Sequence, residues 1–237
     1  NINSGVGSTH LEAIQELVKS TNSDIGIAHD GDADRALFVD GKGEIIDGDH
    51  VLAALAISMS KSGALHKNSV VTTVMSNLGF HKAMEKAGIT VEVTAVGDRY
   101  VLEQINEKEL ALGGEQSGHI IIRELATTGD GILTALALLK LVATKEISVS
   151  ELAQIFPSYP QVLVNLPVRD KSAALADLAI AEAISKAVEL LGEQGRLLVR
   201  ASGTEELVRV MAEADTIERA QETVTSLAAL IQSRHGA

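Results

Sequence analysis

Residues 49–144 alternate between segments whose apolar residues repeat with the period of a helix and segments with the pattern of a strand. The helical segments are 49–62, 78–87, 99–107 and 130–144, and the strand segments are 69–74 and 89–96. Strands that alternate with helices in this way pair in parallel, with the helices on the faces of the sheet. Two further short strands flank the glycine-rich run 113–118. We therefore predict an α/β domain with a mixed sheet.

A different order of elements follows the segment 156–160, which contains two prolines and which we interpret as a linker. The expected elements are a strand at 161–168, a helix at 173–191, strands at 196–201 and 207–214, and a helix at 217–233. Two adjacent strands joined by a tight loop indicate a small α+β domain rather than another strand–helix–strand repeat.

The first part of the chain also has a helix followed by strands. Thr9 and Glu12 have the spacing of a capping box, which predicts the start of a helix. Strands are expected at 24–28 and 36–40. The first residue is Asn1 rather than Met, and we expect that further residues precede it in the natural protein.

The composition excludes several classes of function. A net charge of −12 and an aromatic content of 2% argue against a nucleic-acid partner, which needs a basic surface and stacking side chains. The absence of cysteine excludes disulfides and thiolate metal sites, and it is compatible with a reducing compartment. The most apolar segment, 132–143, contains Lys140 and is too short to cross a bilayer. We expect no membrane partner and interpret this segment as a buried helix.

An acidic run after the strand at 24–28 carries the strongest chemical signal in the sequence. Asp30, Asp32 and Asp34 alternate with small residues, so their carboxylates can converge on one cation when the loop curls, and Gly31 is expected to permit the tight backbone. Hard oxygen ligands of this kind select Mg²⁺, Ca²⁺ or Mn²⁺. Arg35 stands next to the acids and is expected to offset their charge in a site for phosphoryl groups.

The acidic run has three other interpretations. An EF-hand loop would have Gly at its sixth position and Glu at its twelfth, where this chain has Arg35 and Gly41. The haloacid-dehalogenase arrangement would use Asp30 as a nucleophile, but it usually has Thr or Val where Asp34 stands. A solvated surface turn remains the third alternative.

Two further loops combine glycine with polar side chains. In the run 113–119, Glu115, Ser117 and His119 offer an acceptor, a hydroxyl and a titratable ring, which suit sugar hydroxyls and proton transfer. A polar hairpin is the alternative for this run. The run 127–131, Thr-Thr-Gly-Asp-Gly, is interpreted as capping at the start of a helix.

The second loop joins the two adjacent strands of the last domain. Its candidate residues for an oxyanion cradle are Arg200, Ser202, Gly203 and Thr204, with Arg209 as a second guanidinium further along the chain. Loops of this composition also occur as ordinary hairpins.

The three loops, which read DGDADR, GEQSGH and RASGTE, resemble in content and order the motifs of the α-D-phosphohexomutase family. The runs 74–79, 96–100 and 127–131 are more similar to the phosphoglucosamine mutase branch than to phosphoglucomutases or phosphomannomutases. One departure is Glu206, because the family commonly has proline after the SGTE run.

The resemblance implies a fold of four domains around a cleft. Residues 1–46 would be the end of the second domain with the metal loop, 47–157 the third domain with the sugar loop, and 158–237 the fourth domain with the phosphate loop. The first domain, which carries the catalytic phosphoserine, would lie outside this chain, so the fragment alone is expected to be inactive. The chain has no sequence like the Ser-His-Asn-Pro context of that serine.

The resemblance also implies an activity for the intact protein, which is the interconversion of glucosamine 6-phosphate and glucosamine 1-phosphate through a phosphoserine and a bisphosphate. It further implies Mg²⁺ as cofactor, a hexosamine or hexose phosphate as substrate, the missing N-terminal domains as partners and a cytoplasmic location, with a homodimer as an option. The alternatives are a phosphoglucomutase or phosphomannomutase, or a non-catalytic module that binds sugar phosphates. Asp98 and Arg99 are near-site candidates for the acid and base.

Overall fold

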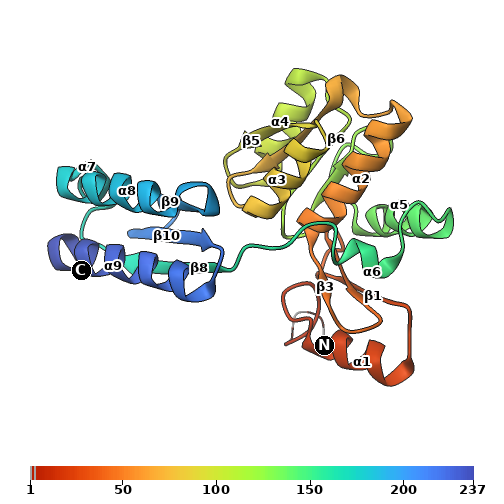
Figure 1. Cartoon of the computed structure of the whole chain (residues 1–237), viewed down its shortest axis with the longest axis horizontal. Helices are drawn as coiled ribbons and strands as arrows, with labels where there is room; N and C mark the ends of the chain where they lie inside the picture. The colour runs from red at the N-terminus through yellow and green to blue at the C-terminus, as the bar shows by residue number, and fades with distance from the viewer. Residues whose placement is uncertain (1, 3) are drawn as a thin grey trace. The chain divides into compact units, whose positions relative to one another are not determined.

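The computed structural model describes residue 2 and residues 4–237, so the expectation about what precedes Asn1 lies outside it. The chain forms two compact units, Asn1–Pro157 and Ser158–Ala237 (Figure 1). Each unit has its own sheet or sheets and its own hydrophobic core. Among the helices of the described residues, none has the length and hydropathy that a bilayer crossing needs.

The first unit begins with helix α1 (Glu12–Thr21) and a three-stranded antiparallel sheet. Its strands are β1 (Ile25–His29), β2 (Ala36–Asp40) and β3 (Ile45–Ile46), in the order β1-β2-β3. The predicted capping box is wrong: α1 starts after Leu11 without a side-chain cap, and Thr9 Oγ1 instead lies 3.0 Å from His10 Nδ1. Every residue of β2 is buried, which fixes the strand that follows the acidic loop.

The second sheet of this unit is mixed, as the alternation of helices and strands predicted. Its strands are β4 (Ser69–Thr73), β5 (Thr90–Thr94), β6 (Leu112–Gly114) and β7 (Ile120–Ile122), in the order β5-β4-β6-β7. β4 pairs in parallel with β5 and β6, whereas β6 and β7 form an antiparallel hairpin. The carboxyl ends of three strands therefore meet at one edge of the sheet.

The helices of this unit connect and cover the strands (Figure 1). They are α2 (Gly48–Ser62), α3 (Leu78–Lys86), α4 (Asp98–Lys108), α5 (Gly131–Ala143) and α6 (Val149–Leu152), with a 3₁₀ turn η1 (His66–Asn68) before β4. α2 ends, as expected, at Gly63 in a left-handed conformation (φ 74°). The segment 132–143, which we expected to be a buried helix, lies in α5 and has an exposed face. Leu138 is buried, but Ile132 and Leu136 are 59% and 64% exposed.

The predicted linker begins later than expected. Phe156 is 5% exposed and its ring stacks on His50, with ring centroids 4.3 Å apart. It also meets Phe80 edge-on. A Cβ at position 79 would lie 2.3 Å from the carbonyl oxygen of Pro157, so only glycine allows this close approach. Phe156 thus belongs to the core of the first unit, whereas Pro157 is exposed.

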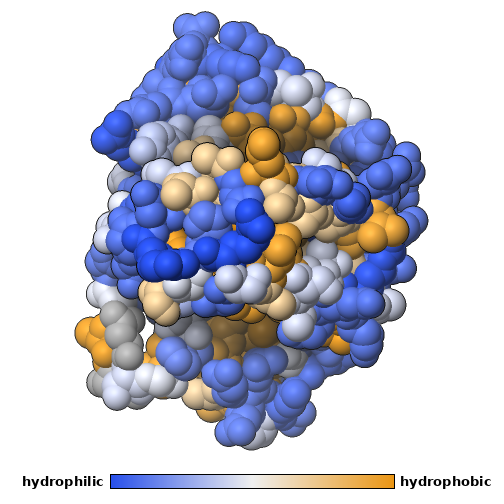
Figure 2. All heavy atoms as spheres, turned by 90° about the vertical axis from the view of Figure 1, so that its left-hand side faces the viewer, coloured by the Kyte–Doolittle hydropathy of each residue, from blue (hydrophilic) through white to orange (hydrophobic). Residues whose placement is uncertain are grey.

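The second unit is a small α+β fold, as predicted. Its elements are β8 (Gln161–Pro167), α7 (Lys171–Ala176), α8 (Leu178–Leu191), the 3₁₀ turn η2 (Gly192–Gln194), β9 (Gly195–Ala201), β10 (Leu207–Ala214) and α9 (Ile217–His235). The antiparallel order β8-β10-β9 places β10 at the centre. Val208, Val210 and Val224 are fully buried in its core. Leu178 and Leu190 are 85% and 78% exposed, and hydrophobic residues are visible among hydrophilic ones on the face in Figure 2.

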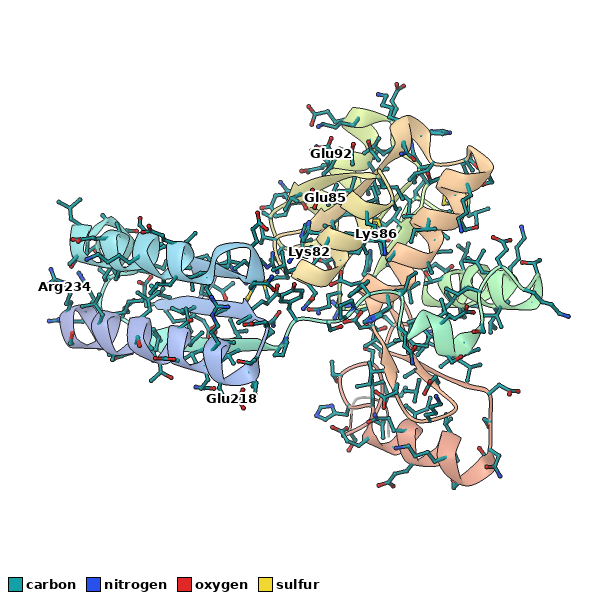
Figure 3. The ribbon with its side chains drawn as sticks, in the orientation of Figure 1. Lys82, Glu85, Lys86, Glu92, Glu218 and Arg234 are labelled. Atoms are coloured by element: carbon teal, nitrogen blue, oxygen red, sulfur yellow. The ribbon has the colours of Figure 1, made fainter. Side chains whose placement is uncertain are left out.

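The helix predicted at 173–191 is interrupted at Asp177. This residue has an extended backbone and caps α8, and its Oδ2 also accepts hydrogen bonds from Arg234 Nε (2.7 Å) and His235 Nε2 (2.8 Å). These partners, Arg234 first, hold the pKa of Asp177 well below its usual range. Arg234 lies in the last turn of α9 and Glu218 in the first (Figure 3), so both charges complement the helix dipole.

The packing of Phe156 makes a prediction about the stability of the first unit. Replacing it by Ala (Phe156→Ala) removes a buried ring and the stacking on His50, so we expect a loss of about 3–5 kcal/mol in the free energy of unfolding. Urea unfolding followed by circular dichroism measures this loss. The control Leu136→Ala, at an exposed position, is expected to stay within about 0.5 kcal/mol of the parent. Equal midpoints for the two variants would contradict the assignment of Phe156 to the core.

Candidate active site

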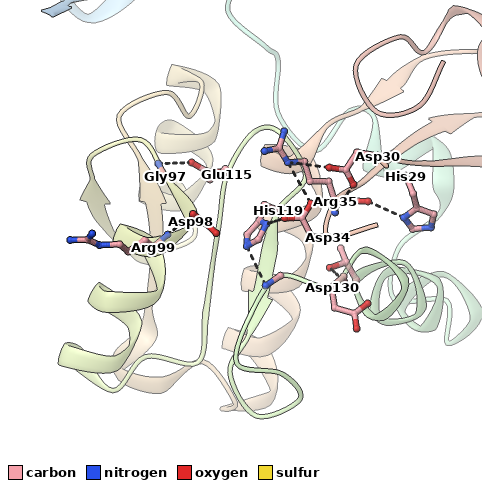
Figure 4. A network of polar contacts seen from close by, with 12 residues as sticks. His29, Asp30, Asp34, Arg35, Gly97, Asp98, Arg99, Glu115, His119 and Asp130 are labelled. Atoms are coloured by element: carbon pink, nitrogen blue, oxygen red, sulfur yellow. Dashed lines mark hydrogen bonds and ion pairs between the residues drawn. The ribbon is translucent and has the colours of Figure 1, made fainter. Parts of the chain in front are cut away.

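The candidate site in the first unit lies where the carboxyl ends of parallel strands approach the loop between β1 and β2. Such an edge is a common place for ligands in α/β sheets, because the loops that leave the strands converge there. One contact joins two of these loops: the N–H of Gly97, after β5, donates to Oε1 of Glu115, after β6, at 3.1 Å (Figure 4).

The acidic loop folds so that its carboxylates converge. Asp30, Asp32 and Asp34 each offer an oxygen, and the three oxygens lie within 4.8 Å of one another. The loop closes through a hydrogen bond from the N–H of Ala33 to the carbonyl oxygen of Asp30 (3.3 Å). Its left-handed residue is Ala33 (φ 58°), whereas the sequence pointed to Gly31. The structure thus brings together the three acids that the sequence selected.

Arg35 gives this acidic loop only partial charge compensation. Its Nε lies 3.6 Å from Asp30 Oδ2 and 3.8 Å from Asp34 Oδ1, which are ionic contacts but not hydrogen bonds (Figure 4). Asp34 Oδ1 is buried and has no hydrogen-bond partner among the described residues. Three carboxylates and one guanidinium leave negative charge that a divalent cation would neutralise. The oxygen-only donor set therefore fits Mg²⁺ or a similar hard cation.

The glycine-rich run 113–119, which we call the sugar loop, is held against the start of α2. The N–H of Gly48 donates to the carbonyl oxygen of Gln116 (3.0 Å), and Gln116 Nε2 donates to Asp47 Oδ2 (3.3 Å). A Cβ on Gly48 would lie 2.1 Å from the carbonyl oxygen of Glu115, so only glycine allows this approach. Ser117 Oγ is buried and finds no partner within the described part of the chain.

His119, the last residue of the sugar loop, is enclosed between Asp34 of the metal loop and Gly129 of the segment 127–131. It is 2% exposed, its Nδ1 lies 2.9 Å from Asp34 Oδ2, and its Nε2 accepts a hydrogen bond from the N–H of Gly129 at 3.2 Å (Figure 4). Because Nε2 is the acceptor, the proton of the neutral ring is on Nδ1, which donates to Asp34. Both ring nitrogens are therefore occupied inside the protein.

The backbone also joins the two loops. Arg35 and His119 form an antiparallel β-bridge, and the N–H of Ala36 donates to the carbonyl oxygen of Gly118 at 3.1 Å. Gly118 has a positive φ of 91°, and a Cβ there would lie 2.5 Å from the carbonyl oxygen of Ala36. Since the two segments are far apart in the sequence, their pairing fixes the metal loop relative to the sugar loop.

The phosphate loop of the second unit lies beside several hydrogen-bond donors, two of which lack a hydrogen-bond partner among the described residues. Arg200 and Arg209 are directly opposite each other on β9 and β10. Burial first, and then the like charge of Arg209, lower the pKa of Arg200. Ser202 Oγ and Arg209 Nε are buried and lack hydrogen-bond partners in the region described. Two guanidinium groups side by side, with unused buried donors, form a site for an anion.

The other residues of this loop, 203–206, are exposed. Gly203 and Thr204 are exposed, and a Cβ on Gly203 would meet nothing within 4 Å. Glu205 lies 3.9 Å from Arg209 Nη2, which is a weak ionic contact. Glu206, the departure from the family pattern, has its side chain paired with Lys171 Nζ at 3.3 Å.

Comparison with known proteins identifies the chain's family. Residues 4–43 match the family model of phosphoglucomutase/phosphomannomutase α/β/α domain II, 47–159 match that of α/β/α domain III, and 163–230 match that of the C-terminal domain. The chain belongs to the phosphohexomutase family.

Several phosphohexomutases that are similar to this chain in sequence are described as phosphoglucosamine mutases. The protein of Streptomyces griseus is 53% identical over 236 residues, and that of Corynebacterium urealyticum is 52% identical over 231 residues. These alignments cover 100% and 98% of this chain but 52% of each relative, so the chain spans about half the length of the curated relatives that it matches.

Solved phosphohexomutase structures share the fold. The N-acetylphosphoglucosamine mutase of Aspergillus fumigatus, in complex with GlcNAc-6P and magnesium, aligns with a TM-score of 0.79 at 24% identity over 98% of this chain and 53% of its own. A family protein from Burkholderia thailandensis aligns with a TM-score of 0.78 at 22% identity over 97% and 52%.

Some residues of the candidate site were missed or interpreted differently from the sequence. Gly97, Gly129 and Gly131 contact the predicted residues through their backbones, and the run 127–131 was interpreted only as a helix cap. Asp130 does cap α5, since its Oδ1 accepts from the N–H of Leu133 at 2.9 Å. The glycine on each side of this cap was the available signal, because capping does not require either of them.

Asp98 and Arg99, the near-site candidates for the acid and base, form hydrogen bonds within α4. Asp98 accepts a hydrogen bond from the N–H of Arg99, and Arg99 Nε pairs with Glu103 at 2.9 Å on the surface of α4. No contact of theirs within the described chain links them to the metal loop.

The paired arginines make a prediction about anion binding. Inorganic phosphate is expected to bind the second unit of this chain and to shift the amide NMR signal of Ser202. Replacing Arg209 by Gln (Arg209→Gln) removes a guanidinium and its charge-assisted hydrogen bonds, so phosphate affinity is expected to fall about tenfold or more. Lys186→Gln is the matched control, because Lys186 is an exposed cation that pairs with Glu182 on the surface of α8. A loss of equal size in both variants would indicate a general charge effect and would contradict the site.

Proposed function

We propose that this chain is the metal-binding and substrate-binding part of a phosphoglucosamine mutase. One observation supports this more than any other: each of the three loops carries a buried polar atom without a hydrogen-bond partner in the described part of the chain, namely Asp34 Oδ1, Ser117 Oγ and Ser202 Oγ. Buried polar atoms are rarely left unsatisfied in native proteins, and ligand sites are a common reason for the exceptions. A cation, a sugar hydroxyl and a phosphate would satisfy the three atoms in turn.

The reaction proposed for the intact enzyme moves a phosphoryl group between two hydroxyls of one sugar. A phosphoserine outside this chain gives its phosphoryl group to the free hydroxyl of the substrate, which forms a bisphosphate. The other phosphoryl group then returns to the serine, so the enzyme ends as it began. Asp30, Asp32 and Asp34 would hold a divalent ion, which would supply Lewis-acid polarisation of the phosphoryl oxygens.

The chain's own residues would bind and orient the substrate. One carboxylate oxygen of Glu115 accepts a hydrogen bond from the N–H of Gly97, and the other can accept one from a sugar hydroxyl. The buried hydroxyl of Ser117 offers the sugar a second polar contact. In the second unit, Arg200, Ser202, Gly203, Thr204 and Arg209 would hold the phosphate that is not reacting, which contributes positioning. Arg35 would offset charge beside the metal ion. We also propose the division into 1–46, 47–157 and 158–237 as parts of three successive family domains.

Glucosamine phosphate is the substrate that we favour. The relatives at 52–53% identity are described as phosphoglucosamine mutases, and this similarity extends over nearly the whole chain. An enzyme for amino sugars of this kind would serve the supply of cell-wall precursors in the cytoplasm. Glucose and mannose phosphates differ from glucosamine phosphate in one or two ring substituents, so they are the competitors that an experiment has to include.

A chimeric enzyme tests the proposal. The C-terminal half of the Streptomyces griseus relative is replaced by this chain, so that the relative supplies the half that this chain does not match. The chimera is expected to convert glucosamine 6-phosphate with a kcat/KM above that for glucose 6-phosphate and mannose 6-phosphate. Asp32→Asn is expected to reduce turnover in the presence of Mg²⁺, because one of three ligands becomes neutral.

The outcomes separate the alternatives. A preference for glucose or mannose phosphate would assign a phosphoglucomutase or phosphomannomutase instead. Binding of sugar phosphate by calorimetry with no turnover on any of the three sugars, in a chimera that unfolds cooperatively, would favour the non-catalytic binding module.

A further inference from the structure

We propose that Lys171 is a positioning residue for the phosphate loop between β9 and β10. It acts through two loop residues to which the proposed function gives no role, Glu205 and Glu206. Glu206 is also the position at which the sequence departs from the family pattern. The inference rests on the proposed function, because it assigns a residue that orders the loop proposed to hold the substrate phosphate.

The tip of the phosphate loop has little burial to hold it. Residues 203–206 are exposed. The base of the loop is closed by a hydrogen bond from the N–H of Ser202 to the carbonyl oxygen of Leu207 at 2.9 Å. An exposed segment loses backbone freedom when it binds a ligand, and this loss lowers the affinity unless the segment is already ordered. Contacts that order the tip beforehand therefore favour phosphate binding.

Lys171 makes such contacts with both its side chain and its main chain. Its Nζ lies 3.3 Å from Glu206 Oε1 and donates to the carbonyl oxygen of Glu205 at 3.2 Å. Its own N–H donates to Glu206 Oε2 at 3.5 Å. The N–H of Val168 adds a hydrogen bond to the carbonyl oxygen of Glu206 at 3.1 Å. Two consecutive residues of the tip are thus held by the connection between β8 and α7.

This connection, residues 168–171, is itself fixed to the rest of the second unit. The N–H of Arg169 donates to the carbonyl oxygen of His235, in the last turn of α9, at 3.0 Å. Asp170 caps α7 with its side chain, and Lys171 is the first residue of that helix. The loop is therefore braced against a helix start and not against another mobile segment.

The charges near the loop separate positioning from simple attraction. Glu205 and Glu206 place two carboxylates in a loop proposed to bind an anion, and Lys171 offsets the charge of Glu206. If only net charge mattered, removal of Glu206 would strengthen phosphate binding. If Glu206 serves to hold Lys171 and the tip, its removal weakens phosphate binding. The two accounts predict effects of opposite sign.

Two replacements of Glu206 that carry the same charge test this difference. Gln keeps an oxygen that can accept from Lys171 Nζ, whereas Ala keeps none. Inorganic phosphate is titrated into this chain by calorimetry. Glu206→Ala is expected to weaken phosphate binding about two- to fivefold, a modest effect because the side chain of Glu206 is 63% exposed. Glu206→Gln is expected to stay within about twofold of the parent. Equal effects of Ala and Gln, or tighter binding by Glu206→Ala, would overturn the inference.

Replacements of Lys171 complete a double-mutant cycle. Lys171→Ala is expected to weaken phosphate binding about fivefold or more, and Lys171→Arg, which keeps the charge and the donors, is expected to restore most of the affinity. In the Lys171→Ala background, Glu206→Ala is expected to cause no further loss. Lys186→Ala is the matched control, because it removes the same charge from an exposed ion pair with Glu182 on α8. Losses from Lys171→Ala and Glu206→Ala that add fully would contradict the positioning role.

Backbone ¹⁵N relaxation of the phosphate-free chain measures the order of the loop without any ligand. The amides of residues 203–205 are expected to be about as ordered as those of β10 in the parent and in Lys171→Arg, and less ordered in Lys171→Ala. An unchanged loop in Lys171→Ala would overturn the inference. If the parent chain bound no phosphate, the proposed phosphate site and the inference would both fail. Phosphate binding that Lys171→Ala leaves unchanged would overturn the inference alone.

Discussion

Electrostatic repulsion within one short loop is the constraint on which the rest of this site depends. Asp30, Asp32 and Asp34 bring three oxygens to within 4.8 Å of one another, and Arg35 supplies one positive charge at distances too long for hydrogen bonds. A loop with such a charge distribution would open in water unless a cation or its own backbone opposed the repulsion. Its surroundings provide backbone support from several directions.

That support comes from segments distant in sequence, which explains why the α/β sheet matters for the site. Parallel pairing of β4 with β5 and β6 puts the loops after these strands at one edge, where Gly97 fixes Glu115. The hairpin of β6 and β7 then carries His119 to Asp34. In the second unit, antiparallel pairing places Arg200 opposite Arg209. In each unit the pairing of strands sets which polar groups meet.

The sequence predicted the elements and the polar loops well, because both depend on local pattern. Hydrophobic periodicity identified the alternation of helices and strands, and the three acids form the cluster that their spacing suggested. The failures concern residues whose conformation is set by distant partners. Phe156 looked like part of a linker but stacks on His50, and Asp177 breaks a predicted helix because it binds Arg234 and His235. The glycines on either side of the Asp130 cap were a local signal, but the sequence pattern does not show which loops they contact.

The central claim is that one divalent ion binds among the three acids of the metal loop. Anomalous diffraction from crystals of this chain soaked in Mn²⁺ tests it most directly. The account predicts a single strong peak with oxygen atoms of Asp30, Asp32 and Asp34 at coordination distances of about 2.0–2.3 Å. A loop with its carboxylates turned apart into solvent, and with Mn²⁺ bound elsewhere or not at all, would contradict it.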